Sequence, residues 1–146
     1  GFELRSQLVW AKPMFAISRG HYHWQHEPCW YAVRKGKPAG WRGARDQATL
    51  LKAGRVGDPY GNYEAVDGAT DHGTQKPVAC AEVPIRNHEG DVYDPFLGSG
   101  TTLIAAARQG RTCYGLEISP AYCDVIRKRW GDYARGAGVD PGPDAL

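Results

Sequence analysis

The sequence predicts an α/β fold, and three observations in its C-terminal half support this. Val92, Tyr93 and Phe96 are apolar or aromatic residues bounded by turn residues, which is typical of a short buried strand. Two glycines, Gly98 and Gly100, and a helical segment over 101–110 follow directly. A second short strand is expected over 112–116. This alternation of strand and helix is typical of α/β proteins.

The bulk composition is that of a globular protein of about one domain. The chain has 146 residues, of which 42% are hydrophobic and 23% charged. It contains no apolar run of about 18 residues, and its first residues do not resemble a signal peptide. We therefore expect a cytoplasmic protein whose four cysteines are reduced thiols.

The N-terminal half predicts strands followed by a glycine-rich insert. A strand is expected over 1–12, a loop or one helical turn over 14–20, and a second strand over 30–33 that breaks at 36–40. Residues 41–73 have the composition of a variable insert, in which only 46–52 could form a short helix. Gln75-Lys-Pro77 then opens a helix that Pro84 should kink or end.

The glycine turn and the last helix carry clear capping signals. Gly98 and Gly100 can adopt backbone angles closed to other residues, and Thr101 and Thr102 can cap the helix that Gly110 ends. A final helix is expected over 120–130, with Ser119 as N-cap and Pro120 at its first position. Its basic residues, expected to face solvent or phosphate, are Arg127, Lys128 and Arg129.

The details of the turn separate several kinds of phosphate or cofactor site. No Lys-Ser or Lys-Thr follows the second glycine, so the turn is not a P-loop. Leu103 stands where a dinucleotide fingerprint needs its third glycine. Glu117, at the tip of the next strand, suits hydrogen bonding to ribose hydroxyls. The sequence therefore predicts a nucleoside cofactor at this strand end.

Three motifs together resemble a known family: Asp94-Pro-Phe-Leu-Gly-Ser-Gly-Thr-Thr102, Gly115-Leu-Glu-Ile118 and Ser119-Pro-Ala-Tyr122. They are similar to the S-adenosylmethionine-binding half of the DNA methyltransferases that make N6-methyladenine or N4-methylcytosine. The match is closest to the permuted (β-type) class, whose Thr-x-Lys-Pro element is similar to His72-Gly-Thr-Gln-Lys-Pro77. The resemblance implies an incomplete Rossmann-like methyltransferase fold.

The resemblance also implies roles for individual residues toward the cofactor, S-adenosyl-L-methionine. Asp94, Phe96, Gly98 and Gly100 would surround its methionine and sulfonium portion. Its carboxylate would meet the helix N-terminus and the residues Gln75, Lys76, Thr101 and Thr102. Glu117 would hold the ribose, and Ile118 would lie against the adenine ring.

A basic segment interleaved with aromatic residues points to double-stranded DNA as a partner. Between 34 and 55 there are seven basic residues and one acid, Asp46, with Trp30, Tyr31 and Trp41 within or beside the run. A solvated loop explains the composition equally well, and the resemblance favours DNA. The candidate DNA-binding residues are Arg34, Lys35, Lys37, Arg42 and Arg45.

A histidine-rich stretch offers a competing interpretation. His21, His23, His26 and Cys29 are all possible metal ligands, but no second cysteine pair accompanies them, so we expect no metal site. The surrounding segment, 24–31, is also similar to a stretch that lies near the target base in the same family. Edge-strand packing remains an equal alternative for these histidines.

The catalytic motif of the resembled family, an acidic or amide residue followed by Pro-Pro-Tyr, is not found in this sequence. Asp58-Pro59-Tyr60 lacks one proline and is better explained as a turn. We therefore expect a C-terminal part that is inactive alone, with the missing catalytic half or a second copy as a further partner. The expected regions are strands of the catalytic half (1–36), a recognition-like insert (37–71), a cofactor-binding region (72–133) and a flexible tail (134–146). The alternatives are a non-catalytic module that binds the cofactor or DNA, and a metal-binding nucleic-acid protein.

Overall fold

The computed structural model describes residues 1–52 and 75–146, which form two compact units. Of the described residues, the first unit contains 1–52 and 86–89, and the second contains 75–85 and 90–146. All ten residues predicted to bind the cofactor fall in the second unit, and the five predicted to bind DNA fall in the first. Asp58-Pro59-Tyr60 and the first three residues of the 72–77 element lie outside the described residues.

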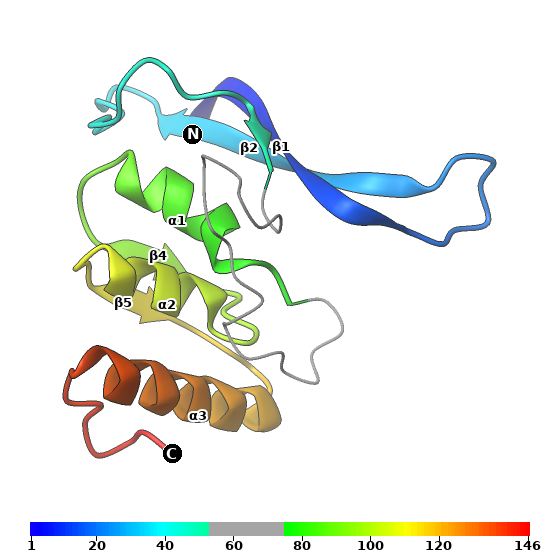
Figure 1. Ribbon diagram of the computed structural model, residues 1–146. Coiled ribbons are helices and arrows are strands. Elements are labelled where there is room, and N and C mark those ends of the chain that lie inside the picture. Colours follow the sequence, from blue (N-terminus) through cyan, green and yellow to red (C-terminus); the bar gives the residue numbers. More distant parts are fainter. Residues whose placement is uncertain (53–74) are drawn as a thin grey trace. The chain divides into compact units, whose positions relative to one another are not determined.

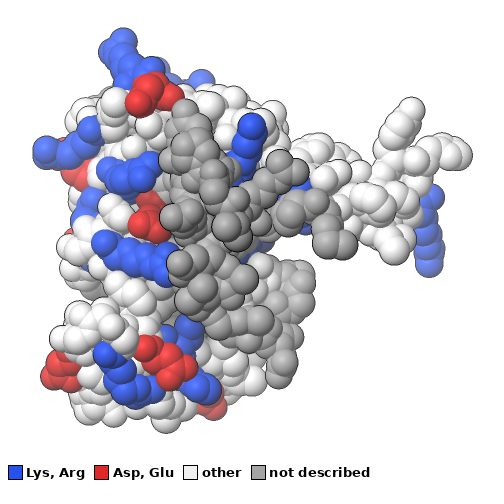
Figure 2. All heavy atoms as spheres, viewed as in Figure 1, with Lys and Arg blue, Asp and Glu red and all other residues white. Residues whose placement is uncertain are grey.

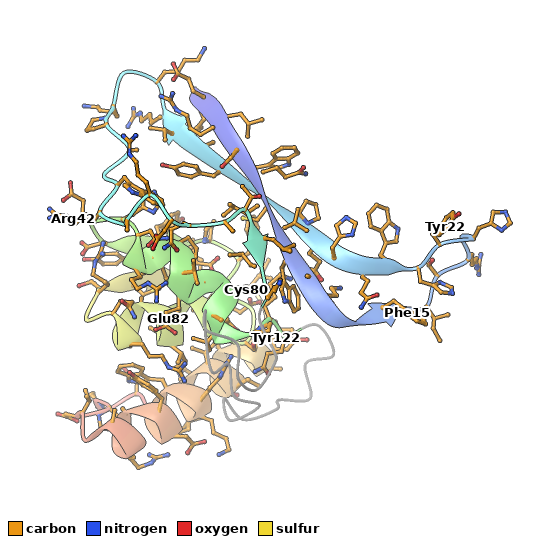
Figure 3. All side chains as sticks on the ribbon, turned by 45° about the horizontal axis from the view of Figure 1, so that its top comes forward. Phe15, Tyr22, Arg42, Cys80, Glu82 and Tyr122 are labelled. Carbon is orange, nitrogen blue, oxygen red and sulfur yellow. The ribbon has the colours of Figure 1, made fainter. Side chains whose placement is uncertain are left out.

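The first unit is built on a long antiparallel pair of strands, β1 (Phe2–Ala16) and β2 (Trp24–Arg34), which form a twisted ribbon in Figure 1. Both strands are longer than predicted: β1 continues four residues beyond the predicted end at Lys12, and β2 begins six residues before Trp30. The register shift between Ala11 and Ala16 spans Pro13, which has no backbone N–H to donate to the ladder. Phe15 and Tyr22 lie at the far end of this ribbon (Figure 3).

The predicted helix over 46–52 is wrong. Leu50–Leu51 instead form β3, which pairs in parallel with Val9 and Trp10, giving the strand order β2-β1-β3. The amide of Val9 also donates to the carbonyl of Thr49 at 2.8 Å. Pairing with the open edge of β1 satisfies backbone groups that an isolated seven-residue helix would leave largely unpaired, so the tertiary contact overrides the local preference.

The second unit contains a strand, a helix and a second strand flanked by two further helices. In chain order these are α1 (Val78–Arg86), β4 (Val92–Asp94), α2 (Thr101–Arg108), β5 (Cys113–Gly115) and α3 (Pro120–Ala137), as drawn in Figure 1. α1 continues two residues beyond Pro84, which lies in its last turn. In this unit the predicted strands, the glycine turn and the starts of the three helices are all confirmed within three residues.

The core of this unit joins its three helices. Val78 of α1 and Ile104 and Ala105 of α2 are buried, and Trp130 and Tyr133 of α3 pack against them. Beside this core, Glu82 of α1 accepts a hydrogen bond from Gln109 Nε2 at 2.7 Å, and Figure 3 labels it together with Cys80 of the same helix. The helix that follows the glycine turn, α2, is therefore anchored in the apolar core of the unit.

The last helix is longer than predicted. It begins at Pro120 after Ser119, as expected, but it runs seven residues beyond Trp130 to Ala137, with Gly138 (φ 68°) as its C-cap. The first four residues of the predicted tail are thus helical, because Ala134 is fully buried and extends the packed face. The remaining residues contact α3: Trp130 Nε1 donates to the carbonyl of Pro141 at 2.8 Å.

Two further expectations concern the environment of the chain. All four cysteines are free thiols, as predicted. Among the described residues, no helix has the length and apolar character that crossing a membrane requires.

Candidate functional site

The carboxyl ends of β4 and β5 form one edge, and several of the predicted site residues lie in or directly after these strand ends. The strands are parallel and pair Val92 with Cys113 and Asp94 with Gly115. Parallel strands end at the same side of a sheet, so Asp94, the last residue of β4, and Glu117, two residues after β5, belong to neighbouring strand ends. This is the edge at which open α/β sheets bind their ligands.

The glycine turn after β4 has the backbone angles that the sequence predicted. Gly98 and Gly100 have φ values of 57° and 83°, in the left-handed region that glycine adopts without strain. A Cβ on Gly100 would lie 3.3 Å from Ile126 Cγ1, so the turn also packs closely on α3. The turn thus needs glycine at position 100 both for its backbone angle and for space.

Glu117 fastens the turn to the end of β5. Its Oε2 accepts a hydrogen bond from the amide of Gly98 at 2.8 Å, and its Oε1 accepts one from the amide of Ser119 at 2.9 Å. The side chain is half-buried. A carboxylate has about four lone-pair sites on its two oxygens, so it can accept several hydrogen bonds at once. The arrangement fixes the orientation of the carboxylate before any ligand arrives.

Two large apolar side chains are exposed beside these polar groups. Phe96 and Ile118 are 87% and 98% exposed, although each follows a strand end within a few residues. Asp94 bends the chain at Phe96 by accepting a hydrogen bond from its amide at 2.9 Å. The edge therefore offers apolar surface next to a carboxylate, a combination that suits a nucleoside.

The start of α2 differs from the prediction in one respect. The N-cap residue is Gly100, and its helix has no side-chain cap, so capping by Thr101 or Thr102 is wrong. The Thr101 hydroxyl is buried and donates instead to the carbonyl of Lys76 at 3.1 Å. Thr102 is half-buried, and Gln75 and Lys76 lie just before α1. The first-turn amides of α2 have no partner within the helix, and amides in this position favour an anion.

Arg129 was predicted to face solvent, and this is wrong. The residue is 8% exposed, and its Nη1 donates to the carbonyl and the hydroxyl of Ser99 at 3.0 and 3.3 Å and to Thr101 Oγ1 at 3.1 Å. Its neighbours Arg127 and Lys128 do face solvent and form ion pairs with Asp124 and Asp132. Hydrogen bonds from the guanidinium to polar oxygens of the turn compensate for the water that this group loses on burial.

The five predicted DNA-binding residues are all exposed in the first unit. Arg42 forms a salt bridge with Glu89, and its Nε donates to the same carboxylate at 2.7 Å. The described chain shows no ion pair for the other four: Arg34, Lys35, Lys37 and Arg45. Figure 2 shows Lys and Arg side chains projecting from the end of the first unit that carries the loop after β2.

The histidine-rich stretch has local partners. His23 Nδ1 accepts from the amide of Ser18 at 3.1 Å and its ring stacks on Phe15, while His26 packs against Trp24. Within residues 1–52 and 75–146, no three His, Cys, Asp or Glu side chains are grouped as a metal site would require. Nothing in the described structure therefore favours the metal-binding interpretation.

Comparison with known proteins decides the family. The family model described as DNA methylase, of the N6/N4 type, matches residues 1–128. The chain belongs to the N6/N4 DNA methylase family. This agrees with the α/β fold and with the strand-turn-helix site described above.

Several relatives of this methylase chain are known. It is 31% identical over 126 residues to the putative methylase YubD of Escherichia coli (strain K12), covering 84% of this chain and 48% of that protein. It is 50% identical over 48 residues to the orphan methyltransferase M.BamHII of Bacillus amyloliquefaciens, covering 32% of this chain and 18% of that protein. The matches thus span less than half the length of these relatives.

Solved methylase structures share the fold. The SAM complex of M1.HpyAVI matches with a TM-score of 0.69 and 27% identity, over 88% of this chain and 63% of that one. TTHA0409 of Thermus thermophilus, a putative DNA modification methylase complexed with S-adenosyl-L-methionine, matches in fold with a TM-score of 0.58 and 24% identity, over 92% and 54%.

Proposed function

We propose that this methylase chain binds S-adenosyl-L-methionine at the ends of β4 and β5, as part of a methyltransferase acting on adenine N6 or cytosine N4 in DNA. The single observation that carries the proposal is the bonding of Glu117 to the amide of Gly98. It joins the carboxylate expected to hold the ribose to the turn expected to pass beneath the methionine portion. Family membership and the SAM complex of M1.HpyAVI support the choice of cofactor.

The described residues fit this cofactor chemically. Glu117 presents a carboxylate, the kind of acceptor that binds ribose hydroxyls, and the exposed Ile118 and Phe96 offer apolar surface to rings. The backbone amides in the first turn of α2 suit a carboxylate. Lys76 lies close to this turn, because its carbonyl accepts a hydrogen bond from the Thr101 hydroxyl. When bound, the sulfonium group supplies an electrophilic methyl group. The protein residues would hold and orient the cofactor, which favours a single direction of attack by the amine on the methyl group.

DNA is the proposed substrate, and the exposed basic residues of the first unit are its proposed contacts. Lys and Arg side chains on one segment can neutralise phosphates whatever the base sequence. The aromatic residues of 24–31 remain candidates for contact with an extruded base. Mutating a phosphate contact should weaken binding for every sequence and reduce its salt dependence.

Methyl transfer itself needs oxygen acceptors and an aromatic side chain around the exocyclic amine. The 146 residues contain no acidic or amide residue followed by Pro-Pro-Tyr. We therefore propose that transfer requires this element to be supplied together with the chain, in the permuted order that the motifs indicate. The same absence favours a second candidate function, a module that binds the cofactor or DNA without catalysis.

Isothermal titration calorimetry of the chain with S-adenosylmethionine and S-adenosylhomocysteine tests the cofactor site. Glu117→Ala should weaken both ligands about tenfold or more, because it removes an acceptor for the ribose and releases the turn. Glu3→Gln, an exposed acid of the other unit, serves as the control and should bind as the wild type does. No heat from either ligand, or a Glu117→Ala protein that binds normally, would refute the site.

Incubation with duplex DNA and a methyl-labelled cofactor separates the two functions. Label on adenine or cytosine supports the enzyme. Cofactor binding without transfer, even when a segment carrying the Pro-Pro-Tyr element is added, supports the non-catalytic module.

A further inference from the structure

One arginine links three separate parts of the second unit. Arg129 of α3 is 8% exposed, and a single nitrogen, Nη1, reaches Ser99 and Thr101 on the glycine turn. Thr101 in turn donates to the carbonyl of Lys76, in the segment before α1. The chain of bonds Arg129–Thr101–Lys76 therefore fixes the segment before α1 relative to the first turn of α2.

The turn is held from two sides. Glu117 bonds the amide of Gly98, while Arg129 bonds the carbonyl of the next residue, Ser99. Burying a guanidinium is unfavourable unless well-placed acceptors receive it, so the contact holds the backbone in one arrangement. The Gly98 N–H and the Ser99 carbonyl belong to the peptide groups on either side of the Gly98–Ser99 peptide, so the two bonds together restrain the backbone angles of the turn.

The two anchors lie toward different ends of the proposed ligand. Glu117 and Ile118 belong to the nucleoside end, while Lys76 and the first turn of α2 belong to the amino-acid end. A carboxylate gains most from amides and an ammonium group when these are held in place before binding. The position of Lys76 relative to α2 depends on the hydroxyl of Thr101, which Arg129 holds.

We propose that Arg129 is a positioning residue for the amino-acid end of the cofactor. The inference rests on the proposed function, since it assumes that the site takes an S-adenosyl ligand. Arg129 acts through Thr101, Ser99 and Lys76, and the nucleoside end depends on Glu117 instead. Loss of Arg129 should therefore weaken ligands that carry the amino acid and spare those that lack it.

S-Adenosylhomocysteine and 5′-methylthioadenosine test this directly. Both contain adenosine and an uncharged thioether, and only the first carries the amino acid. By calorimetry, Arg129→Met should weaken S-adenosylhomocysteine about tenfold and methylthioadenosine less than about twofold. Glu117→Ala should weaken both ligands alike. Lys128→Met, which removes the same charge from the exposed neighbouring position, should change neither.

A conservative variant adds a rescue. The three bonds to Ser99 and Thr101 come from one nitrogen, Nη1, whose two hydrogens are shared among three acceptors, and a lysine ammonium has three hydrogens on one nitrogen. Arg129→Lys should therefore retain S-adenosylhomocysteine affinity within about threefold of the wild type, the shorter side chain accounting for the difference. A role in packing alone would not distinguish the two ligands or favour lysine over methionine.

The outcomes separate the two proposals. Equal weakening of both ligands by Arg129→Met, or weakening of neither, overturns the positioning role while the cofactor site stands. Wild-type protein that binds neither ligand overturns both. If Arg129→Met does not fold, Ser99→Ala removes one acceptor of Arg129 at a residue outside the predicted cofactor contacts, and a smaller loss with the same selectivity is expected. If that variant changes the affinity for both ligands by the same factor relative to the wild type, the positioning role is overturned.

Discussion

Replacing Gly100 with alanine tests both the backbone angle and the packing of the glycine turn, and Gly110 offers a matched control. The two glycines flank the same helix, α2, and have φ values of 83° and 62°. Alanine at either position must adopt left-handed angles. It also restricts the unfolded chain similarly at both positions, so this effect cancels in the comparison.

The magnitudes follow from what each new Cβ would contact. Left-handed angles destabilise an alanine by about 1–2 kcal/mol, and this applies to both variants. At position 110 no atom lies within 4 Å of the added Cβ, whereas at position 100 Ile126 Cγ1 lies 3.3 Å away. Crowding there adds about 1 kcal/mol. Gly100→Ala should therefore reduce the free energy of unfolding by about 2–3 kcal/mol and Gly110→Ala by about 1–2 kcal/mol.

Differential scanning calorimetry measures the difference. With roughly 3 °C per kcal/mol for a chain of this length, the Tm of Gly100→Ala should fall about 3 °C further than that of Gly110→Ala. Titration with S-adenosylhomocysteine adds a second measurement, because only the change at Gly100 displaces the turn. Its affinity should fall about tenfold in Gly100→Ala and stay unchanged in Gly110→Ala.

Two results would refute this reasoning. Equal Tm values for the variants would show that Ile126 moves away without loss, so that packing does not constrain the turn. Equal ligand affinities would show that the geometry of the turn is not what the ligand site needs.

Three further predictions concern the same unit. Gly115→Ala places a Cβ 2.6 Å from Leu97 Cδ2, so the free energy of unfolding measured in urea should fall by about 1–3 kcal/mol. Shortening Leu97 to alanine in the same protein should recover part of this loss, whereas additive losses from the two changes would argue against the clash. Burial, with a smaller contribution from the Asp94 carboxylate, raises the pKa of the Cys113 thiol, so this thiol stays protonated at neutral pH. Iodoacetamide should therefore alkylate Cys113 well after the exposed Cys29, an order that peptide mass mapping measures. Simultaneous labelling of the two cysteines would contradict this prediction. Val78→Ala, at a position 1% exposed, should reduce the free energy of unfolding by about 2 kcal/mol, and a loss below about 0.5 kcal/mol would show that Val78 is not part of the core.

The sequence by itself determined the features that depend on local chemistry. Left-handed backbone angles need glycine, so Gly98 and Gly100 could be assigned to the turn without a structure. A carboxylate directly after a short strand must lie at the strand end, which placed Glu117. Ser119 and Pro120 likewise marked the start of α3. These signals lie within a few residues of the structure that they specify.

The tertiary structure decided whatever depends on partners distant in the chain. Leu50–Leu51 became a strand because the edge of β1 is available, about 40 residues away in the register Val9↔Leu50, and no local pattern contains that edge. Arg129 sits in a basic run that is typical of an exposed face, yet it is buried because Ser99 and Thr101 supply acceptors where α3 packs on the turn. Thr101, for the same reason, binds Lys76 rather than capping its own helix. Hydrogen-bond partners far apart in sequence come together only when the chain folds. The bonds that they then form with each other, in place of bonds to water, override the local propensity of the sequence.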